Sequence, residues 1–283
     1  AGKHVTLMDM IDRPLGNYLN EGLTDVVTKE LTSKGVELAL AETIKGFEGN
    51  KAVTGVKTAN KTYPADLVIC AAGVKPNTNW LSGKVDLTDR GFIDVDPYLQ
   101  TNLPDVYAIG DAILPLSIPA GKPMPIALAT TARREAQYVV DHIFETTPAV
   151  PFKGVVGASA LSVFDYHFAT AGLNTTTAGK ADVPVATSDY KDTLRPAYVP
   201  ESAGNTDVYT SLTFDPLTHQ ILGGAVLSKY DITAQGNVLA LAVAHKLTLE
   251  DLATADFFFQ PGFDRQWSLL NLAAQHALGR ARF

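Results

Sequence analysis

Apolar and polar positions at the start of the chain predict a strand, a helix and a second strand. Residues 3–8 alternate in hydrophobicity and end at Asp9, which is typical of a strand that closes on a carboxylate. Residues 18–34 carry apolar side chains at helical spacing, and Gly35 follows as a suitable end for that helix. Residues 36–40 predict the next strand. The pattern therefore indicates a β-α-β unit.

Asp9 gives this unit a candidate function. An acidic residue in such a position is typical of the second half of a dinucleotide-binding fold, where it accepts hydrogen bonds from the adenosine ribose. It is expected ~20 residues after a Gly-x-Gly-x-x-Gly turn, and this chain contains no such turn. Either the interpretation is wrong, or the first strand, the turn and the first helix precede Ala1. The second alternative implies roughly 170 further residues, as judged from domain sizes.

The following segment predicts a hairpin and then a buried strand. Residues 43–47 and 53–58 flank the turn around Gly49, so we expect them to pair as antiparallel strands. Residues 66–70 are largely apolar and lead to Gly73 and a proline-stiffened loop, which favours a strand end held against a flat ligand. The single cysteine, Cys70, falls in this apolar run, and we expect it to be a buried, unreactive packing residue.

Residues 99–112, which read LQTNLPDVYAIGDA, contain the most specific candidate site of the chain. A polar turn leads into the apolar run 106–109, whose length predicts a buried strand. The run ends in Gly110 and Asp111. Glycine lets a bulky ligand approach the backbone, and an acceptor-only carboxylate at a strand end suits the hydroxyl groups of a sugar or ribityl chain. The alternative is a β-turn and a core strand with an incidental aspartate.

Beyond a helix predicted for residues 128–146, the pattern turns to strands. The boundary is expected at residues 147–151. Strands are predicted at residues 160–171, 183–190, 208–214 and 220–228, and helices at residues 233–245, from 248 and after 262. Residues 215–219 predict a hairpin turn. Residues 257–267 include three adjacent phenylalanines, which cannot all face one core, so part of this segment is expected to meet another surface. The alternative is an aromatic mini-core beneath a loop.

Charge and composition exclude several classes of protein. The net charge is −7 and no basic stripe is interleaved with aromatic residues, which argues against a nucleic-acid partner. No apolar run approaches the ~20 residues of a membrane-spanning helix. The six histidines show no metal-ligand spacing, and residues 159–167 contain no nucleophile elbow. A single cysteine excludes an internal disulfide and fits a reducing compartment. We therefore expect a cytoplasmic protein without a metal or a membrane partner.

Taken in order along the chain, these motifs resemble the pyridine nucleotide-disulfide oxidoreductase superfamily. The string at residues 99–112 is similar to its second flavin-binding motif. The resemblance is closest to the single-cysteine branch of bacterial NADH oxidases, NADH peroxidases and coenzyme A-disulfide reductases, and within it to water-forming NADH oxidases. It implies an α/β fold of partial Rossmann-like domains, for NAD at residues 1–80 and for FAD at residues 81–150. An α+β dimerisation domain would follow at residues 151–283.

For NAD, the resemblance implies roles for three residues. Asp9 would bind the adenosine ribose, and its carboxylate would repel the 2′-phosphate of NADPH. Tyr18 would lie against the adenine, and Gly73 beside the nicotinamide half. These roles imply a preference for NADH.

For FAD, the resemblance implies a second group of residues. Asp111, with Gly110 beside it, would hold the ribityl chain. The start of a helix at Leu128, Ala129 and Thr130 would face the pyrimidine edge of the flavin. Helix N-terminal amides stabilise negative charge on a reduced flavin. The alternative for these three residues is an ordinary start of a core helix.

The activity implied by the resemblance is that of a homodimeric, FAD-dependent NADH oxidase. NADH would give hydride to FAD, and the reduced flavin with a redox cysteine would reduce dioxygen to water. Cys70 does not match the family's redox position, so we expect that cysteine upstream of this chain and expect the isolated chain to be inactive. Alternatives are an NADH peroxidase, a coenzyme A-disulfide reductase, or a non-catalytic interface fragment. Residues 151–283 would form the dimer, with residues 257–267 reaching the partner's flavin.

Overall fold

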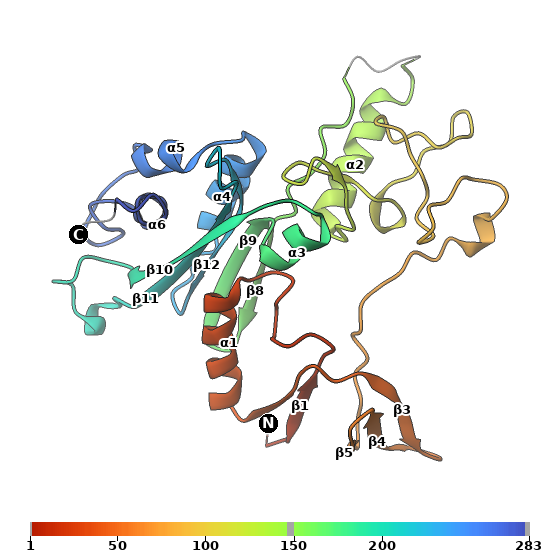
Figure 1. The fold of residues 1–283 in the computed structure, drawn as a ribbon, viewed down its shortest axis with the longest axis horizontal. Helices are drawn as coiled ribbons and strands as arrows, with labels where there is room; N and C mark the ends of the chain where they lie inside the picture. The colour runs from red at the N-terminus through yellow and green to blue at the C-terminus, as the bar shows by residue number, and fades with distance from the viewer. Residues whose placement is uncertain (1, 146–149, 281–283) are drawn as a thin grey trace.

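The largest element of the computed structural model, which describes residues 2–145 and 150–280, is a five-stranded antiparallel sheet (Figure 1). Its strand order is β10-β11-β12-β9-β8. The strands are β8 (Ser159–Val163), β9 (Tyr166–Gly172), β10 (Ala186–Thr193), β11 (Asp207–Phe214) and β12 (Ile221–Ser228). The turn between β11 and β12 is closed by Asp215, whose carboxylate accepts the amides of Leu217 and Thr218. The predicted hairpin is therefore confirmed.

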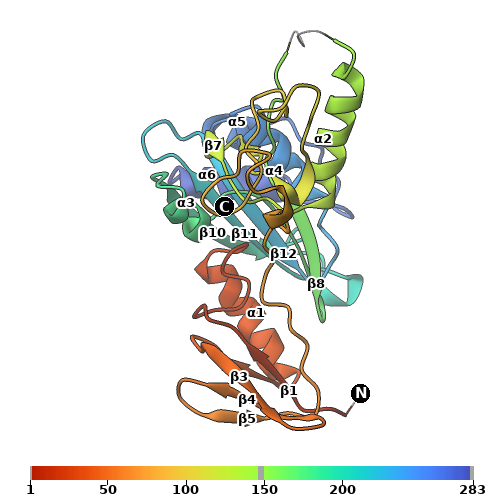
Figure 2. The same ribbon diagram turned by 90° about the vertical axis from the view of Figure 1, so that its right-hand side faces the viewer.

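Helices cover both faces of this sheet because its central strand is apolar on both sides. In β12, Val226 packs into a core with α4 (Gln235–Ala244), α5 (Leu249–Thr254) and α6 (Leu269–Ala277). Ala225 and Leu227 pack into a second core with α1 (Glu21–Ser33). Side chains of a strand alternate between its two faces, so neighbouring residues reach different cores. The first and the last helices of the chain thus share one sheet (Figure 2).

The N-terminal residues form the predicted β-α-β unit. The strands β1 (Val5–Met8) and β2 (Val36–Ala39) pair in parallel, with α1 between them in the sequence. Gly35 follows the helix with φ +81°, a left-handed conformation that glycine adopts without strain. The strands β3 (Ile44–Gly49), β4 (Val53–Thr58) and β5 (Thr62–Pro64) form a three-stranded antiparallel sheet. This sheet confirms the predicted hairpin.

The middle of the chain has few regular elements. It holds η1 (Asn79–Leu81), η2 (Gly110–Ala112), β6 (Leu116–Ser117), β7 (Lys122–Pro123) and α2 (Ala129–His142). A small core of Leu99, Ala108 and Ile113 packs against α2. The helix predicted for residues 128–146 ends earlier, at His142, and residue 146 with residues 147–149 of the predicted boundary lies outside the described residues. Within residues 2–145 and 150–280, no helix combines the length and the apolar character needed to cross a membrane.

Residues 66–70 do not form the buried strand that their apolar pattern predicts. Leu67 and Ile69 are 78% and 83% exposed, and Cys70 is exposed as well. A strand requires a neighbouring backbone for its hydrogen bonds, and among the described residues no strand pairs with this stretch. The prediction that Cys70 is a buried packing residue is therefore wrong, and its thiol lies at the surface.

Residues 106–109 also fail to form the predicted buried strand. They make a single bridge, between Gln100 and Tyr107, and both ends of the run are exposed. The run lies between two residues with left-handed backbone, Asp105 (φ +61°) and Gly110 (φ +72°). Such residues interrupt the extended conformation that a strand requires, so the bridge does not grow into a ladder.

Residues 160–171 form two strands where the pattern predicts one. The chain reverses after β8, with Phe164 at φ +50°, and β9 returns antiparallel to β8. Val163, Phe164 and Tyr166 surround Asp165, the one polar residue of the turn, so the largely apolar pattern does not reveal the reversal. The other predicted strands and helices of this half are present with shifted ends, for example β10 at Ala186–Thr193 in place of 183–190.

Candidate cofactor site

The turn η2 holds Gly110 and Asp111 against the first half of α2. A Cβ atom added to Gly110 would meet the Cβ of Ala132 at 3.5 Å. The backbone N–H of Gly110 donates to Oε2 of Glu135 over 2.6 Å. Asp111 follows in the same turn and is exposed. The predicted glycine and carboxylate therefore lie on a 3-10 turn fixed to a helix, and not on the end of a strand.

The N-terminus of α2 is open to a ligand. Its N-cap residue is Leu128, which makes no side-chain cap. The amides of Thr131 and Ala132 donate to the carbonyl of Leu128, so the amides of Ala129 and Thr130 precede the first intrahelical bonds. Ala129 and Thr130 are both exposed. Unpaired amides at the start of a helix of 14 residues attract negative charge.

Glu135 is the polar residue that ties η2 to α2. Its side chain is 0% exposed. Burial raises the pKa of its carboxyl group above the usual value, the hydrogen bond from Gly110 lowers it, and the nearby charge of Asp111 raises it further. Glu135 is absent from the residues predicted above. Its spacing from Thr131 and Tyr138 places it on the inner face of the helix, which is the signal that could have identified it.

These features fit the ribityl and pyrimidine ends of FAD. An exposed carboxylate accepts hydrogen bonds from hydroxyl groups, and an uncapped helix N-terminus stabilises negative charge. The second carboxyl oxygen of Glu135, Oε1, is buried without a hydrogen-bond partner in the described part of the chain. An unpaired buried oxygen calls for a functional explanation, and the other oxygen of the same carboxyl group is bonded to the turn that carries the exposed Asp111. The residues present therefore fit this cofactor.

Asp9 and Tyr18 lie in another part of the molecule, on the loop between β1 and α1 (Figures 1 and 2). The N–H of Asp9 donates to the carbonyl of Ala39 over 3.1 Å, and Oδ1 of Asp9 accepts the N–H of Ile11 over 3.2 Å. The carboxylate is exposed. The ring of Tyr18 is also exposed, while its carbonyl accepts the hydroxyl of Thr170 over 3.2 Å. Both side chains are accessible to a ligand.

Gly73 lies on the irregular stretch that joins these two regions (Figure 1). Its φ is +92°, and a Cβ atom added there would meet nothing within 4 Å in the described residues. The structure gathers Gly110, Asp111 and the start of α2 in one place. It gathers Asp9 and Tyr18 in another, with Gly73 on the segment between the two.

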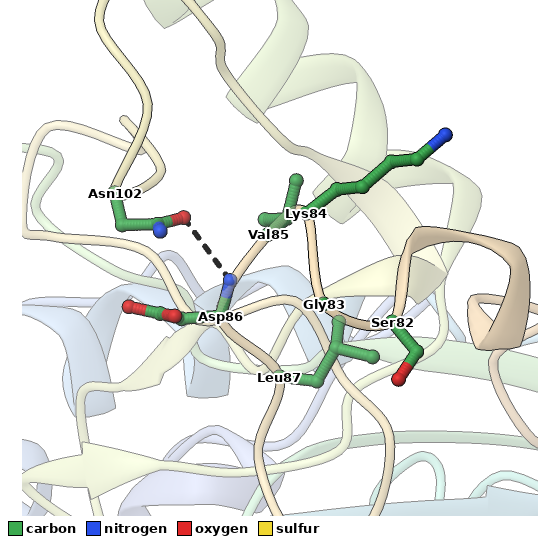
Figure 3. A pocket seen from close by; sticks show the side chains of 7 residues that line it. All are labelled: Ser82, Gly83, Lys84, Val85, Asp86, Leu87 and Asn102. Atoms are coloured by element: carbon green, nitrogen blue, oxygen red, sulfur yellow. Dashed lines mark hydrogen bonds between the residues drawn. The ribbon is translucent and has the colours of Figure 1, made fainter.

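Two hollows in the surface of the described residues lie away from the predicted residues. One of about 400 Å³ is lined by residues 82–87 and Asn102, whose Oδ1 accepts the N–H of Asp86 over 3.0 Å (Figure 3). Another of about 300 Å³ lies between the loop after β1 and the start of α3 (Thr175–Lys180). Neither is lined by a predicted cofactor-binding residue. The described ranges contain no group of three or more potential metal ligands.

Comparison with known families gives two matches in chain order. Residues 1–136 match the family described as "Pyridine nucleotide-disulphide oxidoreductase". Residues 158–269 match "Pyridine nucleotide-disulphide oxidoreductase, dimerisation domain". The first match contains every predicted cofactor-binding residue, and the second contains the five-stranded sheet.

Individual relatives agree with these matches. An NADH oxidase of Enterococcus faecalis is 40% identical over 280 residues, which cover 98% of this chain and 62% of that protein. A coenzyme A disulfide reductase of Staphylococcus aureus is 26% identical and covers 98% of this chain and 61% of its own. The solved water-forming NADH oxidase from Lactobacillus brevis, bound to NADH, has a TM-score of 0.91 at 35% identity, covering 99% of this chain and 61% of that structure. The chain thus spans about three fifths of the length of these relatives.

Proposed function

Because this chain belongs to the pyridine nucleotide-disulphide oxidoreductase family, we propose that it acts as an FAD-dependent NADH oxidase that reduces dioxygen to water. The observation that carries the proposal is the η2 turn, which holds the exposed Asp111 beside the uncapped N-terminus of α2. The relatives in Enterococcus faecalis and Lactobacillus brevis, named NADH oxidase and water-forming NADH oxidase, support this choice of substrates.

The flavin side of the proposal rests on η2 and α2. When bound, FAD supplies the capacity to accept hydride from NADH and to deliver electrons to dioxygen. Asp111 accepts hydrogen bonds from the ribityl hydroxyl groups. Gly110 gives the turn its left-handed backbone (φ +72°) and lets it pack closely against Ala132 of α2. The exposed amides of Ala129 and Thr130, which follow Leu128, stabilise negative charge at the pyrimidine edge.

The nicotinamide side rests on the loop after β1 and on Gly73. Asp9 accepts hydrogen bonds from the adenosine ribose, Tyr18 lies against the adenine, and Gly73 leaves room for the nicotinamide half. Under this proposal residues 1–80 bind NADH and residues 81–150 bind FAD. Residues 151–283 form a homodimer, and the protein acts in the cytoplasm, the compartment that its low cysteine content favours.

A second candidate is reduction of peroxide or of coenzyme A disulfide with the same two cofactors. The coenzyme A disulfide reductase of Staphylococcus aureus, which matches 98% of this chain, supports it. Both candidates require the same residues for FAD and NADH, so these sites do not distinguish the two functions. The functions differ in the electron acceptor.

The test measures NADH oxidation and dioxygen uptake together in the natural protein loaded with FAD. A water-forming oxidase consumes two NADH for each dioxygen, whereas a peroxide-forming reaction consumes one. Addition of hydrogen peroxide or coenzyme A disulfide under anaerobic conditions tests the second candidate. NADH oxidation that depends on either compound and proceeds without dioxygen uptake in air would overturn the oxidase proposal in favour of the corresponding alternative.

A further inference from the structure

Glu135 is a buried acid whose carboxyl group makes one hydrogen bond in the described part of the chain. Its Oε2 accepts the N–H of Gly110 over 2.6 Å, and its side chain is 0% exposed. Its other oxygen, Oε1, finds no partner in the part of the chain that the structure describes. The carboxyl group therefore gives up hydration on both oxygens for a single hydrogen bond to the backbone of η2.

Packing alone does not account for this acid. Burying a polar group without full hydrogen bonding is unfavourable, and an apolar side chain of similar size would fill the same space at lower cost. What an apolar side chain cannot do is accept the N–H of Gly110. That N–H donates to α2 from a turn in which Gly110 has a left-handed backbone, with φ +72°.

The contact determines where Asp111 is presented. Gly110 and Asp111 are consecutive residues of the short turn η2, so fixing the peptide of one restricts the backbone of the other. The same turn packs on α2 at Ala132, one turn before Glu135. Asp111 is thereby tied to the first half of α2, the helix whose N-terminal residues Ala129 and Thr130 are exposed.

We propose that Glu135 is a positioning residue of the flavin site, which anchors the peptide of Gly110 to α2 and so aims Asp111 at the ribityl hydroxyl groups of FAD. This inference rests on the proposed function, because it requires that FAD bind at η2. Glu135 contacts no cofactor atom in this proposal and acts through Asp111.

The test compares two kinds of substitution at this position. Glu135→Gln keeps an oxygen that can accept the N–H of Gly110, so the dissociation constant for FAD, measured by fluorescence quenching, should stay within about threefold of wild type. Glu135→Met, similar in size and flexible, removes the acceptor and should weaken FAD binding at least roughly tenfold. Glu135→Leu serves as a second apolar variant if the methionine variant does not fold, as judged by a thermal melt without FAD.

A double-mutant cycle separates positioning from general destabilisation. In an Asp111→Asn background, Glu135→Met should weaken FAD binding by less than about threefold, because the aimed carboxylate is already lost. Val139→Ala, on the same helix and in the core that it contacts, serves as the matched control and should lower the melting temperature with FAD affinity retained.

The outcomes distinguish a failure of the positioning role of Glu135 from a failure of the proposed function. If wild-type protein does not bind FAD, the proposed function fails and the inference falls with it. If wild type binds FAD and Glu135→Met binds it equally well, only the inference is overturned. Full additivity of Glu135→Met and Asp111→Asn would also overturn it, since the two residues would then act independently.

Discussion

At the scale of single residues, the carboxylates of Asp9 and Glu135 occupy opposite environments. Asp9 is exposed at the end of β1, with one oxygen bound to the backbone N–H of Ile11. Glu135 is buried, and desolvation raises the pKa of its carboxyl group. An exposed acid can meet a ligand directly, whereas a buried one acts on the protein around it. Each environment leads to a different prediction.

Asp9 should set the preference for NADH. Replacing Asp9 with Ser together with Met10→Arg removes the charge that repels a 2′-phosphate and adds one that attracts it. The ratio of kcat/KM for NADH over NADPH should fall at least roughly tenfold. Asp25→Ser, which removes an exposed acid of α1, is the charge-matched control and should leave the ratio unchanged. Equal use of both nucleotides by wild-type protein would contradict the role of Asp9.

Glu135 should make stability fall as the pH rises. Its pKa is raised above 4.5 in the folded state, so the neutral carboxyl is favoured by folding. That stabilisation is complete below pH 4.5 and is lost as the pH rises through the folded-state pKa. Urea unfolding at a series of pH values from 4.5 upward should show the free energy of unfolding of wild type falling relative to that of Glu135→Gln. Glu42→Gln is a control in which the pH dependence should be reversed. Hydrogen bonds lower the pKa of Glu42, so wild type should gain stability relative to this variant as the pH rises. A difference in the free energy of unfolding between wild type and Glu135→Gln that does not change with pH would refute the prediction.

At the scale of elements, Asn20 shows how α1 is joined to the C-terminal sheet. It is the N-cap residue of α1 but makes no side-chain cap. Its Nδ2 instead donates to the hydroxyls of Ser211 (2.8 Å) and Thr213 (3.2 Å) in β11. Its Oδ1 accepts the N–H and hydroxyl of Thr175 at the start of α3. One buried amide thus connects three elements that are far apart in the sequence.

Removal of this amide should destabilise the whole chain. Asn20→Ala leaves two buried hydroxyls and a backbone N–H without their partner, which we expect to lower the free energy of unfolding by about 1–3 kcal/mol. Asn17→Ala removes an exposed amide on the same loop, whose Oδ1 accepts a hydrogen bond from Lys180, and should cost less than about 0.5 kcal/mol. Urea denaturation measures both. Equal losses for the two variants would show that the buried network contributes nothing specific.

At the scale of the whole molecule, residues 257–267 present aromatic side chains to the surface. Phe257 packs against the C-terminal core, whereas Phe258 and Phe263 are 70% and 71% exposed. The segment is held in place by Arg195, whose Nε donates to the carbonyl of Gly262 over 2.8 Å, and by an ion pair of Arg265 with Asp192. Exposed aromatic residues on an anchored segment suit a protein–protein interface.

The homodimer proposed for residues 151–283 should depend on this segment. Phe258→Asp combined with Phe263→Asp places two charges where apolar contact is expected and should weaken dimerisation at least roughly tenfold. Analytical ultracentrifugation over a range of protein concentrations measures the change. Phe144→Asp, which alters an exposed aromatic residue outside this region, is the matched control. A dimer of unchanged affinity in the double variant would exclude this segment from the interface.

Local chemistry in the sequence was sufficient for much of this protein. The β-α-β start follows from the helical spacing before Gly35, and the β11–β12 hairpin follows from the turn at Asp215. The Gly110-Asp111 pair and the helix start at Leu128 also stand out by residue type alone. These features depend on residues within a few positions of one another, so they can be predicted from the sequence alone.

Only the tertiary structure decided features that depend on distant partners. Residues 66–70 are apolar enough for a buried strand, yet the described chain offers them no strand to pair with, and Cys70 is exposed. Asn20 has the residue type of a helix cap but bonds to a sheet residue 191 positions away in the sequence. Glu135 appears as an ordinary helix residue until η2 folds against it. Burial and hydrogen bonding are properties of the assembled neighbours, which local sequence does not specify.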